Sequence, residues 1–305
     1  MKITYLDEPT YLPDYAIKRF RELGEFVVYS DRPSPKEAIR RLNDTDIAIV
    51  EWIAINDEMF SQLQRLKYIV VALTGYSFVD VDAAKRQDIK VSNIPTYSRQ
   101  SVAEHAFALL LATNRKLLLA DQEARKGKRD YFAPFLSSEL YGKTLGILGL
   151  GSIGSWVAQI GHGFGMQVIG TSRTMKNLPN VRQVSLTELL MNSDCLMVCV
   201  DRNESTKGML SREKLSMMKK TAFLVSVVSG ICDEHALADM LAKGSLAGVG
   251  IDALGKESPL LHSENSVFSP HIAWYTQDTL DRLISIMTKN VEQFILGKPQ
   301  NVVNP

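Results

Sequence analysis

A glycine-rich turn in the middle of the chain has residue types and spacing that suit the binding of a phosphate. Residues 149–154 read Gly-Leu-Gly-Ser-Ile-Gly, after an apolar run at 143–148 that we expect to be a buried strand and before a helical pattern. Strand, G-x-G-x-x-G and helix together form the dinucleotide-binding pattern. Gly149 would make the tight turn, Gly151 would let the backbone approach a pyrophosphate, and Gly154 would let the helix pack on the strand. We therefore expect a dinucleotide at the amino end of this helix.

The bulk composition fits a two-domain globular protein and argues against several classes of function. The chain has 305 residues, of which 45% are hydrophobic and 23% charged, and its formal net charge is +1. This length suits two domains, and a net charge near zero gives no field that would recruit nucleic acid or an anionic membrane. No apolar run reaches the roughly 18 residues of a membrane span, and no His, Cys, Asp or Glu cluster has metal-ligand spacing. The three cysteines lack a disulfide-framework spacing and the first residues lack the apolar region of a signal peptide, so we expect a cytoplasmic protein.

Short β runs alternate with helical patterns along most of the chain. A long helical stretch at about 98–126 and a loop at 130–140, which contains Pro134, lead to a second set of strands that begins near residue 143. A final helix is expected at 276–296. In the first hundred residues the expected strands are 3–6, 26–29, 47–50, 68–72 and 89–92. Such alternation implies parallel sheets with helices on both faces. The sequence therefore predicts an α/β fold with two doubly wound parallel-sheet lobes.

Four stretches of the chain occur in the order and with the spacing of one known family. They read Leu-Thr-Gly-Tyr-Ser-Phe-Val-Asp at 73–80, Ser-Val-Ala-Glu-His at 101–105, the strand and glycine turn at 142–154, and Pro-His-Ile-Ala-Trp at 270–274. Together they resemble the D-isomer-specific 2-hydroxyacid dehydrogenase family, and the last stretch is similar to its glyoxylate and hydroxypyruvate reductases, also called D-glycerate dehydrogenases.

The resemblance implies a domain arrangement and an assembly. A Rossmann NAD(P)-binding domain at 98–272 would be inserted in a flavodoxin-like substrate domain, which is formed by 1–97 and by a returning helix at 273–305. It also implies a homodimer whose contact is made by the helix at 98–126 and the loop that follows it.

Two residues are implied in proton transfer. His271 would exchange the proton, because an imidazole titrates near neutral pH and this residue follows Pro270 at the expected end of a strand. Glu257 would orient His271 and raise its pKa. Reduction of a 2-oxo acid also needs hydride from a nicotinamide cofactor and a group that holds the carboxylate. A surface histidine and an exposed loop carboxylate are the structural alternatives for these two residues.

The expected substrate-binding residues include a departure from the family pattern. Backbone amides at Thr74, Gly75 and Tyr76 would bind the carboxylate, and the glycine at position 75 allows a positive φ there. An ordinary turn after a strand is the alternative. The family has an arginine in a turn after the fifth strand of the nucleotide domain, and here that position is Ser229 or, counted without a gap, Val228. A serine hydroxyl cannot replace a permanently charged bidentate guanidinium. Loss of the arginine would typically cost ~2–4 kcal/mol of transition-state binding. Either another cation fills this role, or the substrate differs, or activity is poor.

The end of the second expected Rossmann strand indicates which cofactor binds. NAD enzymes place an acid there to bind the ribose hydroxyls, but here the position is Ser172, followed by Arg173 and Thr174. An acid would repel a 2′-phosphate, whereas these residues would bind one, so we favour NADP over NAD; a solvated basic loop with NAD still accepted is the alternative. The residues expected to bind the cofactor are Val102, Gly149, Gly151, Ser152, Ile153, Gly154, Ser172, Arg173, Thr174, Val200, Asp201, Thr206, Val227, Asp252 and His271.

The function implied is hydride transfer to a small 2-oxo acid, with glyoxylate or hydroxypyruvate as the substrate. The rival hypothesis is a nucleotide-binding sensor or scaffold with weak or no reductase activity, which the missing arginine favours and the presence of His271 and Glu257 opposes. A third hypothesis, intermediate between these two, is a reductase that acts on another carbonyl substrate.

Overall fold

The chain forms two compact units. The computed structural model describes residues 1–128 and 135–305, so the first part of the loop expected at 130–140, with Pro134, lies outside the described residues. Unit 1 comprises Met1–Tyr97 and Thr276–Pro305, and unit 2 comprises Ser98–Tyr275. The chain therefore leaves unit 1 once and returns to it, and the return lies at 275–276 rather than at the expected 272–273.

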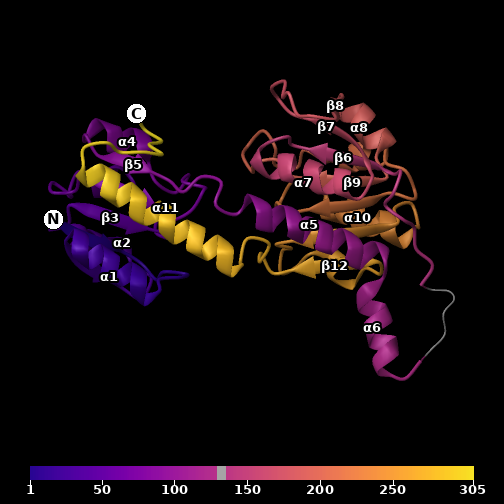
Figure 1. Ribbon diagram of the computed structural model, residues 1–305, viewed down its shortest axis with the longest axis horizontal. Coiled ribbons are helices and arrows are strands. Elements are labelled where there is room, and N and C mark those ends of the chain that lie inside the picture. Colours follow the sequence, from indigo (N-terminus) through magenta and orange to yellow (C-terminus); the bar gives the residue numbers. More distant parts are fainter. Residues whose placement is uncertain (129–134) are drawn as a thin grey trace. The chain divides into compact units, whose positions relative to one another are not determined.

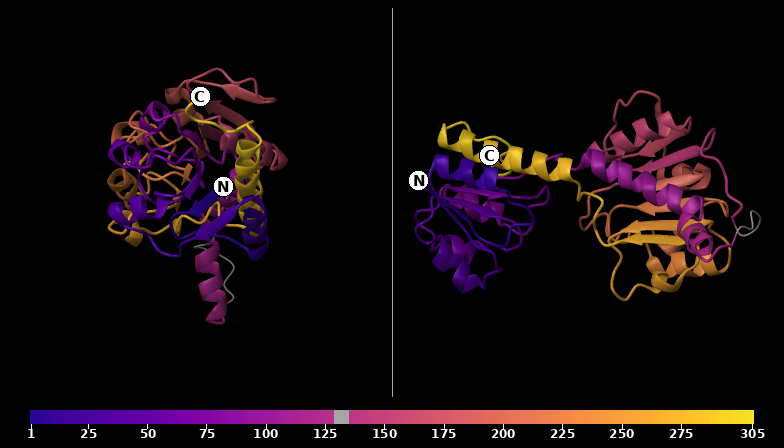
Figure 2. Two further views of the ribbon diagram at one scale, coloured as in Figure 1. Left: turned by 90° about the vertical axis from the view of Figure 1, so that its left-hand side faces the viewer. Right: turned by 60° about the horizontal axis from the view of Figure 1, so that its bottom comes forward.

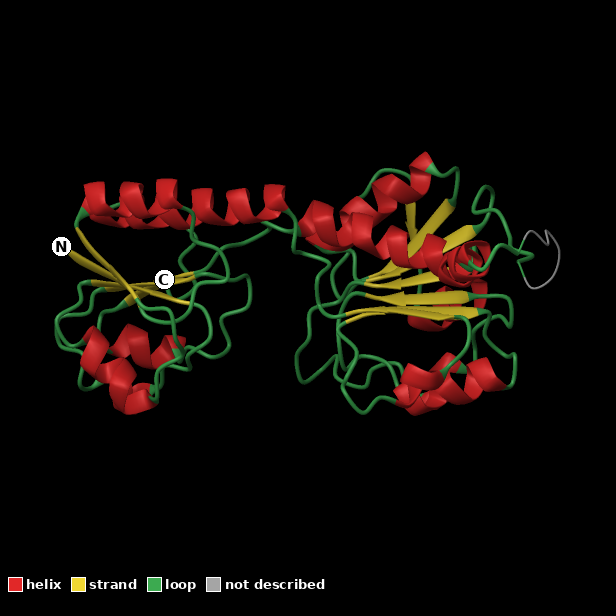
Figure 3. Ribbon diagram, turned by 90° about the horizontal axis from the view of Figure 1, so that it is seen from below, coloured by secondary structure: helices red, strands yellow, loops and turns green. Residues whose placement is uncertain are grey.

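Unit 1 is a five-stranded parallel sheet with helices on both faces (Figure 3). Its strands are β1 (Lys2–Tyr5), β2 (Glu25–Val28), β3 (Ile47–Val50), β4 (Tyr68–Val71) and β5 (Lys90–Ser92), and its helices are α1 (Asp14–Leu23), α2 (Pro35–Leu42), α3 (Asp57–Phe60), α4 (Val81–Arg86) and α11 (Gln277–Ile295). The strand order is β2-β1-β3-β4-β5. All residues of β3 and β4 are buried, since helices cover both faces of the sheet.

The C-terminal segment is an integral part of unit 1. Phe294 of α11 stacks on Tyr68 of β4 with ring centroids 4.2 Å apart. Beyond the helix, Asn304 accepts a hydrogen bond of 2.8 Å from the N–H of Val91 in β5. Thr276 caps α11 by accepting from the N–H of Thr279. These contacts explain why the returning chain belongs with the first 97 residues (Figure 1).

Unit 2 is a seven-stranded parallel sheet. Its strands are β6 (Thr144–Leu148), β7 (Gln167–Thr171), β8 (Val181–Gln183), β9 (Cys195–Val198), β10 (Phe223–Ser226), β11 (Gly248–Asp252) and β12 (Ser266–Ser269). Its helices are α5 (Arg99–Asn114), α6 (Leu117–Arg125), α7 (Ser152–Gly163), α8 (Leu186–Asn192), α9 (Arg212–Leu215), α10 (Glu234–Ala242) and a 3₁₀ turn at Pro259–His262. The strand order is β12-β11-β10-β9-β6-β7-β8. From β6 the chain adds strands toward one edge as far as β8, and then from β9 onward it adds them on the other side of β6. Ligands of doubly wound sheets bind at the carboxyl ends of the strands beside such a reversal. The predicted fold class is therefore confirmed for both units.

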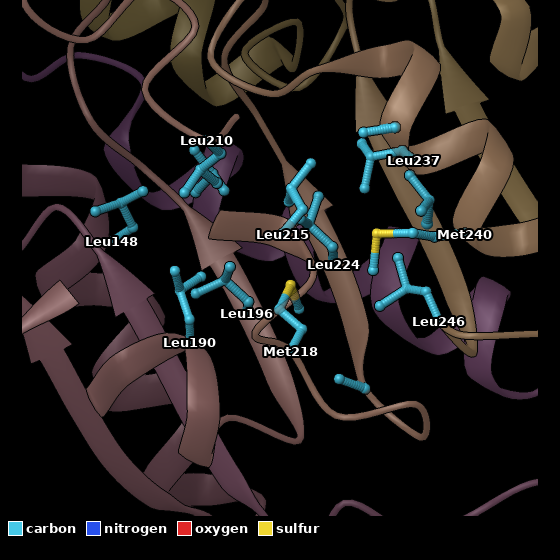
Figure 4. Close-up of a cluster of buried hydrophobic side chains, with 14 of the residues drawn as sticks. Leu148, Leu190, Leu196, Leu210, Leu215, Met218, Leu224, Leu237, Met240 and Leu246 are labelled. Atoms are coloured by element: carbon cyan, nitrogen blue, oxygen red, sulfur yellow. The ribbon is translucent and has the colours of Figure 1, made fainter. Parts of the chain in front are cut away.

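Two hydrophobic cores sandwich the sheet of unit 2. Strand β9 shows the alternation that produces them, because Leu196 and Val198 face one core while Cys195 and Met197 face the other. The first core is filled mainly by leucine and methionine side chains from strands and from helices α8, α9 and α10 (Figure 4). The rigid sheet that results fixes the loops at its carboxyl edge.

The helical stretch expected at 98–126 is two helices, so the prediction of one continuous element was wrong. Lys116 lies between α5 and α6 with a left-handed φ of 50°. Asn114, the last residue of α5, donates to the carbonyl of Ser138 and ends the packed part of the helix. Helix α6 buries none of its residues and projects away from the body of unit 2 (Figures 1 and 2). Among the described residues, no helix is long and apolar enough to span a membrane.

Candidate cofactor and catalytic site

The glycine turn has the geometry that its sequence predicts. Gly149 has a φ of +102°, and a Cβ built on it would lie 2.8 Å from the backbone nitrogen of Val200. A Cβ on Gly154 would lie 2.0 Å from the carbonyl oxygen of Gly149, so only glycine lets α7 pack this closely on the turn. Gly151 has no atom within 4 Å of its Cβ position, which leaves room for a ligand. No side chain caps the amino end of α7, so its free N–H groups can bind an anion.

A cavity of about 460 Å³ lies against this turn, at the carboxyl ends of β6, β7 and β9. The predicted cofactor residues that line it are Gly149, Gly151, Ser152, Ile153, Ser172, Arg173, Thr174, Val200, Asp201 and Thr206. Sequence reasoning did not include some other lining residues, among them Asn203, Ser205 and Met209. Of the remaining predicted residues, Val102, Gly154, Val227, Asp252 and His271 do not line the cavity. The turn, the open helix end and the size of this cavity fit the diphosphate and adenosine part of a dinucleotide.

The β7 side of the cavity is basic. Ser172 follows β7, and its hydroxyl donates to the carbonyl oxygen of Thr174 over 2.6 Å, which folds the loop back on itself. Arg173 and Lys176 both line the cavity, and neither forms an ion pair with a carboxylate in the part of the chain that the structure describes. No acidic residue follows β7 directly.

The loop after β9 forms the opposite side of the cavity and is braced internally. The hydroxyl of Thr206 donates to the carbonyl oxygen of Asp201 over 2.6 Å and accepts from the N–H of Asn203 over 2.9 Å. The same loop is bound to the loop after β10, because the N–H of Gly208 donates to the carbonyl of Gly230 over 2.8 Å. Thr206 therefore shapes the wall of the cavity as well as lining it.

His271 lies two residues after the end of β12, in an exposed turn with a left-handed φ of +60°. This conformation is uncommon for a residue other than glycine and often marks a functional position. The turn is held by Asp252, whose buried carboxylate accepts from the N–H of Ile272 over 3.0 Å and from the N–H of Ala273 over 3.1 Å. The hydroxyl of Ser269 donates to the same carboxylate over 2.7 Å. Asp252, predicted to bind the cofactor, thus has its oxygens engaged in holding the segment that carries His271.

Glu257 and His271 are both described, and neither a hydrogen bond nor an ion pair joins their side chains. Glu257 lies in the loop after β11, and His271 follows the neighbouring strand β12. Their proposed catalytic pairing therefore stays a prediction. His105 contacts a different residue, because its Nε2 atom lies 2.8 Å from the hydroxyl oxygen of Ser269, which donates to Asp252.

An arginine side chain lies against the position where the family pattern has an arginine. The Arg202 Nη1 atom donates to the hydroxyl of Ser229 over 3.3 Å, and the Arg202 Nε atom lies 3.6 Å from the Cβ position of Gly230. Arg99 instead lies over the ring of Trp156, and Arg282 donates to the carbonyl of Tyr97 over 2.8 Å. Sequence reasoning did not single out Arg202. The available signal was its place directly after Asp201, at the expected end of a strand.

Residues 74–76 follow β4 in unit 1. The hydroxyl of Thr74 donates to the carbonyl of Ile94 over 3.0 Å, and the side-chain amide of Asn93 donates to the carbonyl of Thr74 over 2.7 Å. These two bonds tie Thr74 to the residues that follow the neighbouring strand β5. Gly75 does not adopt the positive φ that its residue type allows, since it is not among the glycines in the left-handed region. The substrate-binding role of Thr74, Gly75 and Tyr76 stays a prediction.

Nucleophilic thiol and metal chemistry gain no support from the described residues. Burial raises the pKa of the Cys199 and Cys232 thiols to about 12, so both are neutral at pH 7 and unreactive. No group of three or more His, Cys, Asp or Glu residues in the described ranges is placed to hold a metal ion.

Comparisons with known proteins identify the family. The model of the NAD binding domain of D-isomer specific 2-hydroxyacid dehydrogenases matches residues 107–273, more than half of the chain. A hydroxypyruvate reductase from Blautia hydrogenotrophica is 34% identical, with 100% of both chains covered. A glycerate dehydrogenase from Methylorubrum extorquens is 32% identical, covering 99% of this chain and 98% of the relative.

Among solved structures, an acyclic imino acid reductase (Bsp5) in complex with NADPH and D-Arg has a TM-score of 0.93 and 42% sequence identity. That comparison covers 99% of this chain and 100% of the reductase. The chain therefore belongs to the D-isomer specific 2-hydroxyacid dehydrogenase family, and it is an oxidoreductase with an NAD-binding domain.

Proposed function

We propose that this chain is an NADPH-dependent reductase of a small 2-oxo acid, with glyoxylate or hydroxypyruvate as the substrate. The observation that carries the proposal is the left-handed turn with His271, which Asp252 holds at the same sheet edge as the glycine turn. The names of the relatives, hydroxypyruvate reductase and glycerate dehydrogenase, point to the same substrates.

The residues of the chain would divide the reaction as follows. The bound nicotinamide supplies hydride for the 2-carbon of the substrate. His271 donates a proton to the carbonyl oxygen, so that the alcohol rather than an alkoxide is formed. Glu257 would orient the imidazole of His271 for the transfer. The first turn of α7 holds the diphosphate, and Asp252 keeps the His271 turn in place.

We propose NADPH over NADH because of the charges at the end of β7. Ser172, Arg173 and Lys176 line the cavity where a 2′-phosphate would lie, and no acid follows the strand to repel it. A carboxylate at that place would favour the free ribose hydroxyls of NADH. The solved imino acid reductase, which is in complex with NADPH, agrees with this preference.

We also propose that the protein acts as a homodimer in the cytoplasm. Helix α6 buries none of its residues, and Leu117 and Leu118 are 57% and 54% exposed. Exposed leucines on a projecting helix are typical of an interface with another chain. Cytoplasmic location agrees with three free cysteines.

The substrate is tested by following NADPH absorbance with glyoxylate or hydroxypyruvate. We expect steady oxidation, and we expect His271→Asn to slow it by about a hundredfold or more, because a positioned acid contributes about 10²–10⁴ in rate. His262→Asn is the matched control, since this exposed histidine of the 3₁₀ turn lies outside the proposed chemistry. Tight NADPH binding without turnover of any 2-oxo acid would instead restore the sensor hypothesis, which the comparisons do not support.

A second candidate is reduction of a 2-imino acid, the product of a 2-oxo acid and an amine. The 42% identity to an acyclic imino acid reductase favours it. His271 would then protonate nitrogen in place of oxygen. Adding ammonia or methylamine to a 2-oxo acid distinguishes the two. A rate that rises with amine and yields an amino acid identifies the imine as the substrate, whereas an amine-independent rate identifies the 2-oxo acid.

A further inference from the structure

We propose that Arg202 binds the carboxylate of the substrate, and this inference rests on the proposed function. A 2-oxo or 2-imino acid carries a carboxylate at neutral pH, and a site that excludes water binds such a group best with a fixed guanidinium. Arg202 is an exposed arginine at the carboxyl edge of unit 2, and no described carboxylate forms an ion pair with it. Its charge is thus available to a ligand.

The side chain of Arg202 is directed away from the dinucleotide cavity. Its neighbours Asp201 and Asn203 line that cavity, and Arg202 does not. Its guanidinium instead lies against the loop after β10, where it donates to the Ser229 hydroxyl over 3.3 Å and passes 3.6 Å from the Cβ position of Gly230. A role in holding the cofactor phosphates therefore does not account for the placement of Arg202.

Backbone bonds fix the loop that carries Arg202. The N–H of Gly208 donates to the carbonyl of Gly230 over 2.8 Å, and the N–H of Leu210 donates to the carbonyl of Ile231 over 2.9 Å. Together with the bonds of Thr206 to the same loop, they join the loops after β9 and β10 into one wall. The fold therefore holds the loop that carries Arg202, and the bond to Ser229 directs its guanidinium toward the loop after β10.

Sheet geometry brings this wall near His271. Strands β9, β10, β11 and β12 are consecutive and parallel, so the loops that carry Arg202, Ser229 and His271 all leave the sheet at one edge. β10 and β12 are two strands apart, which corresponds to about 10 Å at the usual strand spacing. A substrate held by Arg202 at its carboxylate could present its carbonyl or imine group to His271. Ser229, in place of a second arginine, leaves Arg202 room to do so.

Two variants and one control test the proposal. Arg202→Leu should raise the KM for hydroxypyruvate about a hundredfold, since a charge-assisted contact of this kind typically contributes that much. Arg202→Lys should lose less, about tenfold, because it keeps the charge but not the fork. Lys207→Gln removes a charge from the same loop and should leave KM unchanged. Adding Ser229→Arg to the Arg202→Leu variant should recover much of the loss, which a merely structural role of Arg202 would not allow.

A binding measurement separates this proposal from the proposed function. Oxalate, a non-reacting dicarboxylate, is titrated into the NADPH-loaded protein while nicotinamide fluorescence is followed. We expect Arg202→Leu to raise the Kd of oxalate at least thirtyfold and to leave the Kd of NADPH unchanged, even if no 2-oxo acid proves to be turned over. A raised NADPH Kd with unchanged oxalate binding would make Arg202 a cofactor residue and overturn the proposal. Unchanged binding of both, or no binding of oxalate by the natural protein, would overturn it as well.

Discussion

Replacing Asp252 by Asn tests whether this carboxylate positions His271. The two Asp252 oxygens accept three hydrogen bonds, from the Ser269 hydroxyl at 2.7 Å and from the N–H groups of Ile272 and Ala273 at 3.0 and 3.1 Å. An asparagine has one acceptor oxygen, which can keep the bonds from Ser269 and Ile272. Its NH₂ group would face the N–H of Ala273, and leaving a buried donor unpaired costs about 1–3 kcal/mol.

The full effect follows from two further contributions. The remaining bonds would fall from charged to neutral strength, a loss of about 1 kcal/mol each, while removal of a buried charge offsets part of this. We expect Asp252→Asn to lower the free energy of unfolding by about 2–3 kcal/mol. We also expect kcat to fall about tenfold to a hundredfold, since a small displacement of an acid has effects of that size.

The assay combines urea unfolding with steady-state kinetics and NADPH titration. Asp194→Asn is the matched control, because Asp194 accepts from the N–H of Thr144 over 2.8 Å at the opposite, amino-terminal edge of the same sheet. It should lose stability and keep kcat. The Kd of NADPH should not change in Asp252→Asn, because Asp252 does not line the cavity. A variant that loses stability but keeps kcat, or that binds NADPH much more weakly, would refute this account of Asp252.

Three further predictions concern the cofactor cavity and unit 1. Arg173→Gln should raise the Kd of NADPH about tenfold to a hundredfold and leave that of NADH unchanged; equal changes by fluorescence titration would defeat the NADP proposal. Gly154→Ala should unfold at a markedly lower temperature, because its Cβ would lie 2.0 Å from a backbone carbonyl oxygen. Gly151→Ala has room for its Cβ, so it should keep its melting temperature and lose NADPH affinity. The reverse pattern would contradict the proposed binding of the cofactor at the glycine turn. Burial raises the pKa of the Glu51 carboxyl. Its contribution to stability is therefore full below the unfolded carboxyl pKa of about 4.3 and is lost as pH rises through the folded pKa. Glu51→Gln should gain stability relative to the natural protein as pH rises above that unfolded value, as measured by thermal melts at several pH values, and a difference that stays constant with pH would refute the assignment.

Local patterns made much of unit 2 predictable. The glycine turn was recognisable because the reasons for its glycines are local in the backbone. At Gly149 and Gly154 neighbouring backbone atoms leave no space for a side chain. Strands β6, β7 and β9 were visible as apolar runs because helices bury both faces of the sheet. The cavity residues Ser172, Arg173 and Asp201 followed from the rule that ligands bind at the carboxyl ends of parallel strands.

Long-range packing decided what the sequence did not reveal. The contact of Arg202 with Ser229 joins residues 27 positions apart, and it depends on the adjacency of β9 and β10 and on backbone bonds between their loops. The break at Lys116 was hidden because leucines continue directly after it, although Leu117, Leu118 and Leu119 remain 57%, 54% and 39% exposed. Asp252 was expected to contact the cofactor. The sequence could not show that the oxygens of its carboxylate accept hydrogen bonds from Ser269, Ile272 and Ala273.

A crystal structure of the complex with NADPH and oxalate would show directly whether reduction takes place at the carboxyl edge of the unit 2 sheet. We expect the diphosphate at the first turn of α7 and the 2′-phosphate beside Arg173. We expect one oxalate carboxylate on the guanidinium of Arg202, and the imidazole of His271 within hydrogen-bond distance of the oxalate. A dinucleotide bound elsewhere, or an oxalate that contacts neither Arg202 nor His271, would contradict the assignment of this sheet edge as the site of reduction.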